Sequence, residues 1–285
     1  MPVESSPTHG ASLSAWSVMS VATAGLAHLE GSPPLPCQDA ADGVATPRPA
    51  LVLADGAGSS PDSGLGARVL IAVMLRLVDT LEAQLAWLLD GRDEPSPEVL
   101  RQFAELLSRH ARGSLVDRAA EQHRAVRDLR CTLLLALVGH ERLLWLKIGD
   151  GEIVLERAAP LAERAGEEPG LAPHLFTLGE RGKGEFANQT CFVDERLDVA
   201  QVQYGCESTV ALTGIALMSD GAAEKLVSLD GEQVSGQLSY WFDDLRQGRL
   251  RQRQLVRRFY SEEFCRGTSG DDRSIALLAR EPEAR

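Results

Sequence analysis

The chain has 285 residues, of which 44% are hydrophobic and 25% charged, a composition typical of a globular protein that buries a sizeable core. Its 29 basic and 41 acidic residues give a net charge of −12, which argues against nucleic acid or anionic lipid as partners. Five scattered cysteines without a CxxC pair indicate neither a zinc site nor a disulfide framework. Neither a secretion signal nor an apolar run that could span a bilayer is present, so we expect a cytoplasmic protein.

In chain order, residues 1–15 are small and polar, and we predict a disordered tail ahead of a single domain at 16–281. Ser96 and Pro97 have the residue types of a helix N-cap and first helical position. Hydrophobic periodicity predicts helices at 65–89, from 97 to beyond 115, at 233–245 and at 249–264. It predicts strands at 16–23, 51–54, 131–138, 143–148, 152–155, 210–218 and 274–278.

The Asp150-Gly151 pair lies between two apolar runs, which is a strong hairpin signal. We therefore expect the three strands at 131–155 to form an antiparallel meander. Residues 160–184 are rich in Gly, Pro and charge, and we predict a mobile surface loop there. Strands on both sides of two long helices predict an α+β fold with layers in the order α-β-β-α.

Acidic residues stand where apolar strands begin or end. Asp55 follows LVLA, Asp220 follows IALMS, and Asp271 precedes SIALL. We expect central strands of one sheet to bring them together. Two unit charges about 4 Å apart repel by roughly 4 kcal/mol at an effective dielectric of about 20, so such a cluster implies a bound hard cation, Mg²⁺ or Mn²⁺ rather than Zn²⁺. Any one Asp-Gly pair alone is more typical of a simple turn, but three acids, each against a buried strand, favour a common site.

These segments, in this order, resemble the metal-dependent serine/threonine protein phosphatases of the 2C type, in particular their divergent bacterial branch. The matching segments cover roughly 16–279 and read GLAHLEGSPPLPCQDA, LVLADGAGS, CTLLLALV, LLWLKIGDGEIVL, GEFANQTCF, IALMSDGAAE and GDDRSIALLA. The resemblance implies a four-layer α-β-β-α sandwich of antiparallel sheets flanked by helices. It also implies hydrolysis of phosphoserine and phosphothreonine in proteins, with in-line attack on phosphorus by a water that bridges two cations.

The resemblance also assigns metal ligands. Asp55 matches the acid that bridges both cations, with the Gly56 carbonyl beside it. Asp220 and Asp271 match the other ligands of one cation, and Asp39 matches an acid on the side of the second. Asp150 matches a ligand of a weaker third cation, although a hairpin corner explains it equally well. The expected cofactors are therefore two Mn²⁺ or Mg²⁺ per chain, with a third more weakly bound.

The sequence departs from the usual family pattern at several positions. Ala57 replaces a His that many members have as proton donor, and His28 stands near the place of a phosphate-binding Arg. His28 could bind phosphate or donate a proton, although a lone His at a strand–loop junction is more often structural. Asp272 replaces the usual Asn, so either Asp271 or Asp272 could face the metal, and we expect Asp271.

Asn188 and Thr190 match a segment specific to the bacterial branch, which we interpret as a flap or a support of the site. The resemblance implies that the partner is a protein phosphorylated by a Ser/Thr kinase, and we expect a monomer.

Other functions fit the sequence less well. Gly56, Gly58, Gly64 and Gly66 fit neither GxGxxG nor GxxxxGK[ST], so a nucleotide-binding loop is not indicated. A GxSxG elbow of a serine hydrolase is absent. The remaining alternative is a catalytically inactive phosphatase fold that binds a phosphoprotein or regulates a kinase pathway. The loss of a ligand acid would favour that alternative, and all four expected core acids are present.

Overall fold

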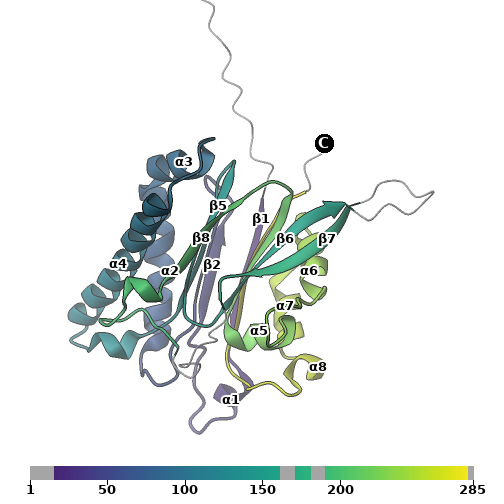
Figure 1. Ribbon diagram of the computed structural model, residues 1–285. Coiled ribbons are helices and arrows are strands. Elements are labelled where there is room, and N and C mark those ends of the chain that lie inside the picture. Colours follow the sequence, from purple (N-terminus) through teal and green to yellow (C-terminus); the bar gives the residue numbers. More distant parts are fainter. Residues whose placement is uncertain (1–15, 161–170, 181–189, 282–285) are drawn as a thin grey trace, which may run out of the picture.

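The computed structural model describes residues 16–160, 171–180 and 190–281, which form four layers (Figure 1). One sheet has the strand order β1-β10-β9-β6-β7 and the other β2-β3-β4-β5-β8, and all pairs are antiparallel. The strands are β1 (Ser17–Thr23), β2 (Ala40–Val44), β3 (Ala50–Ala54), β4 (Leu133–Val138), β5 (Arg142–Ile148), β6 (Glu152–Pro160), β7 (Leu171–Leu178), β8 (Gln203–Ser208), β9 (Leu212–Met218) and β10 (Arg273–Ala279). The predicted fold class is confirmed.

Helices cover the outer face of each sheet (Figure 1). The helices against the β2–β8 sheet are α2 (Ser63–Thr80), α3 (Glu82–Asp90) and α4 (Pro97–Glu121). Those against the other sheet are α5 (Asp220–Leu226), α6 (Gln237–Arg246), α7 (Gln252–Phe259) and α8 (Glu262–Cys265). A short helix α1 (Leu26–Leu29) and the 3₁₀ turns η1 (Val126–Leu129) and η2 (Val199–Gln201) complete the described elements.

Each sheet is buried on both faces, so three apolar clusters lie between the four layers. Between the sheets, Leu53 on β3 is paired with Leu134 on β4, and both pack in one cluster with Leu217 on β9 and Leu278 on β10. The alternate residues of the same strands face the helices in two further clusters. This double burial explains why β4 (LLLALV) is apolar at every position rather than at every second one.

Helix α4 begins as the sequence predicts. Ser96 is its N-cap, and its hydroxyl accepts a hydrogen bond from the Val99 amide at 3.3 Å. The single helix predicted at 65–89 is wrong, however. The backbone leaves helical geometry at Leu81, which separates α2 from α3. Because apolar residues continue across Leu81 at helical spacing, periodicity alone does not reveal the break.

The predicted meander at 131–155 is also wrong, although its first two strands do pair. After β5 the chain bends at Gly149, which has a φ of +111°, and β6 enters the other sheet between β7 and β9. Asp150 therefore lies in a connection between sheets and not at a hairpin corner. A side chain at Gly149 would be strained by this φ, and its Cβ would lie 2.5 Å from the Thr132 side chain.

Part of the predicted loop at 160–184 is a strand. Residues Leu171–Leu178 form β7, which pairs with β6, whereas 161–170 and 181–189 lie outside the described residues. The predicted tail at 1–15 lies outside them as well. Within the described part of the chain, no helix combines the length and apolar character needed to cross a membrane.

Candidate metal centre

The predicted acids lie in loops at one end of the two sheets. Asp55 and Asp150 follow β3 and β5, and Asp39 precedes β2, all in one sheet. Asp220 and Asp271 come from the other sheet, after β9 and before β10. The expectation of a single sheet was therefore wrong, because the crossing of β6 places these strand ends opposite one another. The cluster joins the two halves of the sandwich.

Asp55 is held by its backbone. Its amide donates to the Thr132 hydroxyl at 2.9 Å, and its carbonyl accepts from the Thr132 amide at 2.8 Å. Gly56 follows without a side chain, and a Cβ there would lie 2.7 Å from the Gln38 carbonyl oxygen. The glycine therefore lets the segment that carries Asp39 approach Asp55 closely.

Asp39 is a buried carboxylate that no Lys or Arg of the described residues neutralises. It is 5% exposed, and neither of its carboxylate oxygens has a hydrogen-bond donor in bonding geometry. Burial and then the negative charge of Asp272 raise the pKa of Asp39 to about 7, although the hydroxyls of Ser219 and Ser274 lie nearby and lower it in part. A buried anion with free lone pairs needs a cation beside it.

Asp55 and Asp220 continue the cluster from Asp39. Burial, followed by the charges of Asp39 and Asp220, holds the pKa of Asp55 well above its ordinary value. Burial and then the charge of Asp150 raise the pKa of Asp220 to about 6, with Asp271 adding to the effect. Asp39, Asp55, Asp220 and Asp150 therefore form a series of acids, in which neighbouring carboxyl groups affect one another's pKa.

Asp150 is exposed and accepts a hydrogen bond of 2.6 Å from the Thr190 hydroxyl. The contact connects the segment that begins at residue 190 to the acid cluster. Asn188, the other residue of the predicted flap, lies outside the described residues.

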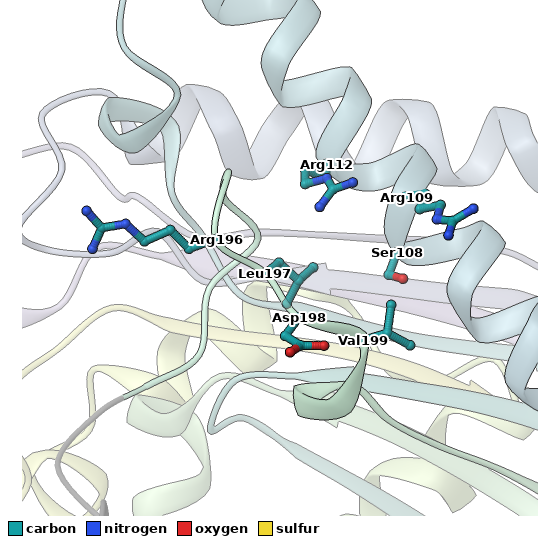
Figure 2. A pocket seen from close by; sticks show the side chains of 7 residues that line it. All are labelled: Ser108, Arg109, Arg112, Arg196, Leu197, Asp198 and Val199. Atoms are coloured by element: carbon teal, nitrogen blue, oxygen red, sulfur yellow. The ribbon is translucent and has the colours of Figure 1, made fainter.

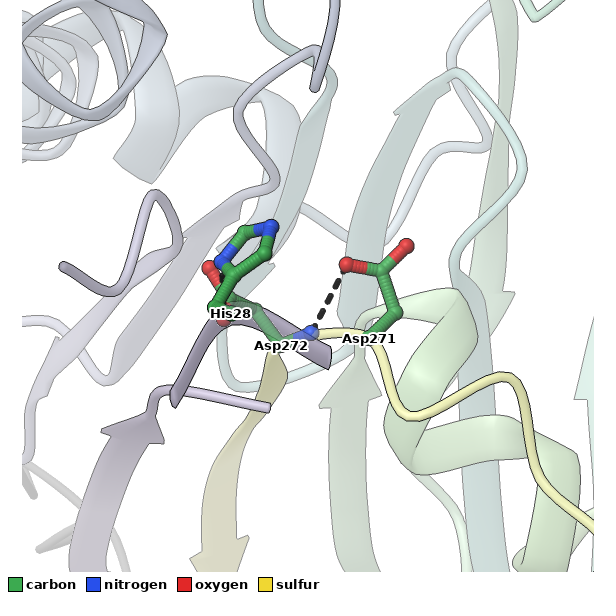
Figure 3. Close-up of side chains that lie close together, drawn as sticks. All are labelled: His28, Asp271 and Asp272. Atoms are coloured by element: carbon green, nitrogen blue, oxygen red, sulfur yellow. Dashed lines mark hydrogen bonds and ion pairs between the residues drawn. The ribbon is translucent and has the colours of Figure 1, made fainter. Parts of the chain in front are cut away.

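Asp271 and Asp272 have different surroundings (Figure 3). Asp271 is exposed, and its Oδ1 accepts the Asp272 amide at 2.8 Å. Asp272 is 3% exposed, and its oxygens accept the amides of Gly25 at 2.7 Å and Gln38 at 2.6 Å. Its Oδ1 also lies 2.8 Å from Nδ1 of His28, although the ring N–H is not aligned on this oxygen. The sequence alone did not reveal this role of Asp272.

The residues present suit hard cations. In the described ranges, no Lys or Arg forms an ion pair with Asp39, Asp55, Asp220 or Asp271. Burial raises the pKa of the neighbouring Cys37 and Cys131 thiols, so soft thiolate ligation is disfavoured. Donor atoms of His28, Asp271 and Asp272 lie within 4.8 Å of one another, although both oxygens of Asp272 already accept backbone amides. The other predicted acids do not belong to this set.

The sequence matches the family model described as protein phosphatase 2C over residues 25–258. The chain belongs to the protein phosphatase 2C family. The match includes His28, Asp39, Asp55, Asp150 and Asp220 and ends before Asp271. The predictions of the family and of a protein phosphatase are therefore confirmed.

Individual members of the protein phosphatase 2C family are similar over nearly the whole chain. Serine/threonine-protein phosphatase 3 of Escherichia coli (strain K12) is 26% identical over 273 residues, which are 92% of this chain and 97% of that protein. A serine-threonine phosphatase 2C from Toxoplasma gondii has a TM-score of 0.59 at 13% identity, covering 94% of this chain and 95% of its own. The catalytic domain of PstP has a TM-score of 0.55 at 17% identity, covering 93% and 98%.

A separate pocket of about 350 Å³ lies between α4 and the segment before η2 (Figure 2). Arg109 and Arg112 project from α4, while the Arg196 side chain extends away from them (Figure 2). Asp198 is the one acid in its lining, and its carboxylate caps η2 through the Ala200 amide at 3.0 Å. The pocket shares no residue with the acid cluster and offers no set of oxygen ligands for a cation.

Proposed function

We propose that this protein hydrolyses phosphoserine and phosphothreonine in proteins with two divalent cations, Mn²⁺ or Mg²⁺. The buried, unpaired carboxylate of Asp39 beside Asp55 is the observation that carries the proposal. Buried negative charges without cations destabilise the folded protein, and bound cations would offset this cost. The structure of the PstP catalytic domain contains two manganese ions, which supports the same number here.

In this proposal Asp55 would be a ligand of both cations, with the Gly56 carbonyl as a further ligand. Asp220 and Asp271 would hold one cation, and Asp39 would lie on the side of the other. Asp150, supported by Thr190, holds a weaker third. When bound, such cations would supply an activated water for in-line attack and positive charge to offset that of the phosphoryl oxygens.

His28 is the proposed contact for the phosphate. Its ring stands beside Asp271, with Nδ1 toward Asp272 and the other nitrogen away from it (Figure 3). The second ring nitrogen could donate to a phosphoryl oxygen or to the leaving group when the imidazole carries a proton on both nitrogens. Ala57 stands where many family members have a His as proton donor, so in this proposal His28 takes that role. The net charge of −12 makes the cations the main attraction for a phosphorylated protein.

Hydrolysis of p-nitrophenyl phosphate and of phosphoserine and phosphothreonine peptides tests this function. We expect turnover with Mn²⁺ or Mg²⁺ and none in chelator. Asp220→Asn should lower kcat/KM at least 100-fold, while Asp117→Asn, at an exposed position on α4, should leave it unchanged. Binding of a phosphopeptide without turnover in any metal would favour the inactive binding module. Equal turnover in chelator would contradict the metal requirement.

A further inference from the structure

The carboxylate of Asp272 contacts three places in the N-terminal part of the described chain, all far from Asp272 in the sequence. Its Oδ1 accepts the Gly25 amide at 2.7 Å, and its Oδ2 accepts the Gln38 amide at 2.6 Å. The same Oδ1 lies 2.8 Å from Nδ1 of His28. The first two contacts span 247 and 234 residues of sequence. One buried side chain therefore fixes the loop before α1, α1 itself and the loop before β2.

Each anchored segment carries a group of the candidate site. His28 lies on α1, Asp39 follows Gln38, and Asp271 precedes Asp272. The short helix also rests directly on the loop at 270–272, because the Ala27 amide donates to the Gly270 carbonyl at 2.9 Å. The relative positions of His28, Asp39 and Asp271 thus depend on the same carboxylate.

The oxygens of Asp272 are already in use. Two short hydrogen bonds from backbone amides occupy them, one on each oxygen, and the side chain is 3% exposed. Asp271 is exposed and receives one such bond. An Asn at 272 would offer one acceptor oxygen and an NH₂ group, so one of the two amides, Gly25 or Gln38, would face a donor. A carboxylate satisfies both amides and adds an attraction for His28.

We infer that Asp272 is a positioning residue of the phosphatase site, which holds His28 and Asp39 in place relative to Asp271 without binding a cation itself. This inference rests on the proposed function. Groups that orient metal ligands through hydrogen bonds commonly contribute 10- to 100-fold in metal affinity or activity. The replacement of the family's usual Asn by Asp is thereby connected with the presence of a histidine at position 28.

The test is Asp272→Asn with Glu156→Gln as the matched control. Glu156 is also a buried carboxylate, and it accepts from the Thr213 hydroxyl at 2.9 Å and from Arg246 at 2.6 Å, away from the site. We expect Asp272→Asn to weaken Mn²⁺ binding, measured by calorimetry, about 10-fold or more and to lower kcat by about 10- to 100-fold. The number of bound ions should not change. Glu156→Gln should lower the melting temperature while Mn²⁺ affinity and kcat stay within about 2-fold of wild type.

His28→Ala separates the two parts of the role. It should lower turnover and leave Mn²⁺ affinity unchanged. Because Asp272→Asn also acts through His28, the loss of kcat in the double variant should be smaller than the product of the two single losses. Should Asp272→Asn fail to fold, Asp272→Glu keeps two acceptor oxygens displaced by one methylene, and a smaller loss of Mn²⁺ affinity is expected.

Unchanged Mn²⁺ affinity and kcat in Asp272→Asn would overturn the inference, and so would the loss of one bound ion, which would make Asp272 a ligand. A wild-type protein whose Mn²⁺ affinity is weakened by Asp272→Asn without the loss of a bound ion, but which hydrolyses no phosphate ester, would contradict the proposed function alone.

Discussion

The carboxyl groups of Asp55 and Asp220 each influence the pKa of the other, although the two residues follow strands of different sheets. Asp55 is fixed by both of its backbone hydrogen bonds to Thr132, and Asp220 is the first residue of α5. Burial and neighbouring acids disfavour the ionised forms of both groups in the metal-free protein, and bound cations would reverse the effect. Stability measurements can therefore detect the site independently of catalysis.

Asp220→Asn should stabilise the metal-free protein, because it removes a buried charge that Asp150 and Asp271 repel. The expected gain is about 1–2 kcal/mol in the free energy of unfolding at pH 7.5, which corresponds to a rise of a few degrees in the melting temperature. Differential scanning calorimetry in chelator measures it. Asp117→Asn, which removes an exposed charge on α4, should change the melting temperature by less than about one degree.

Addition of Mn²⁺ should then make wild type more stable than Asp220→Asn. Wild type and Asp117→Asn should gain stability with increasing Mn²⁺, because a ligand that binds only the folded state stabilises it. Asp220→Asn should gain much less. A metal-free Asp220→Asn protein that melts below wild type would show that the Asp55–Asp220 contact is stabilising as it stands.

The stability of the metal-free protein should fall as the pH rises. The pKa values of Asp39 and Asp220 are raised to about 7 and about 6 in the folded state, above about 3.9 for an unfolded Asp. Between pH 4 and 7 the folded protein therefore binds more protons, and the free energy of unfolding decreases as these protons are lost. Urea unfolding in chelator at pH 5 and pH 8 measures the difference. The Asp39→Asn/Asp220→Asn double variant should show a flatter profile, and an increase in wild-type stability from pH 5 to pH 8 would contradict this origin.

Gly56→Ala should damage the metal site, whereas Gly58→Ala should not. A Cβ at Gly56 would lie 2.7 Å from the Gln38 carbonyl oxygen and 2.9 Å from Oγ of Ser63, so the segment with Asp39 must move. At Gly58 a Cβ meets nothing within 4 Å. We expect at least a 10-fold loss of Mn²⁺ affinity by calorimetry for the first variant and none for the second. Equal affinities would show that the approach of Asp39 to Asp55 does not determine binding.

Much of this site could be predicted from local sequence. Asp55 and Asp220 stand beside runs of apolar residues that become β3 and β9, and buried strands of this kind leave a strong signal. The resemblance to the phosphatase family then supplied their partners, including Asp39, which no strand pattern singled out. The four-layer order followed from the same elements.

Contacts between distant segments could not be predicted in this way. Asp150-Gly151 has the residues of a hairpin turn, and only the pairing of β6 with β9 shows that the chain changes sheets there. The function of Asp272 depends on amides 234 and 247 residues away. Neither relationship produces a periodic pattern, because each is fixed by the packing of complete layers rather than by neighbouring residues.

Anomalous diffraction from crystals grown with Mn²⁺ tests the central claim most directly, since it locates the ions without reference to activity. We expect two strong peaks in the anomalous difference map. Oxygen atoms of Asp55, Asp220 and Asp271 should surround one peak, and Asp55 with the Gly56 carbonyl should contact the other, on the side of Asp39. Crystals with saturating Mn²⁺ and no peak among these carboxylates, or with ions only at other surface acids, would contradict the proposed metal centre.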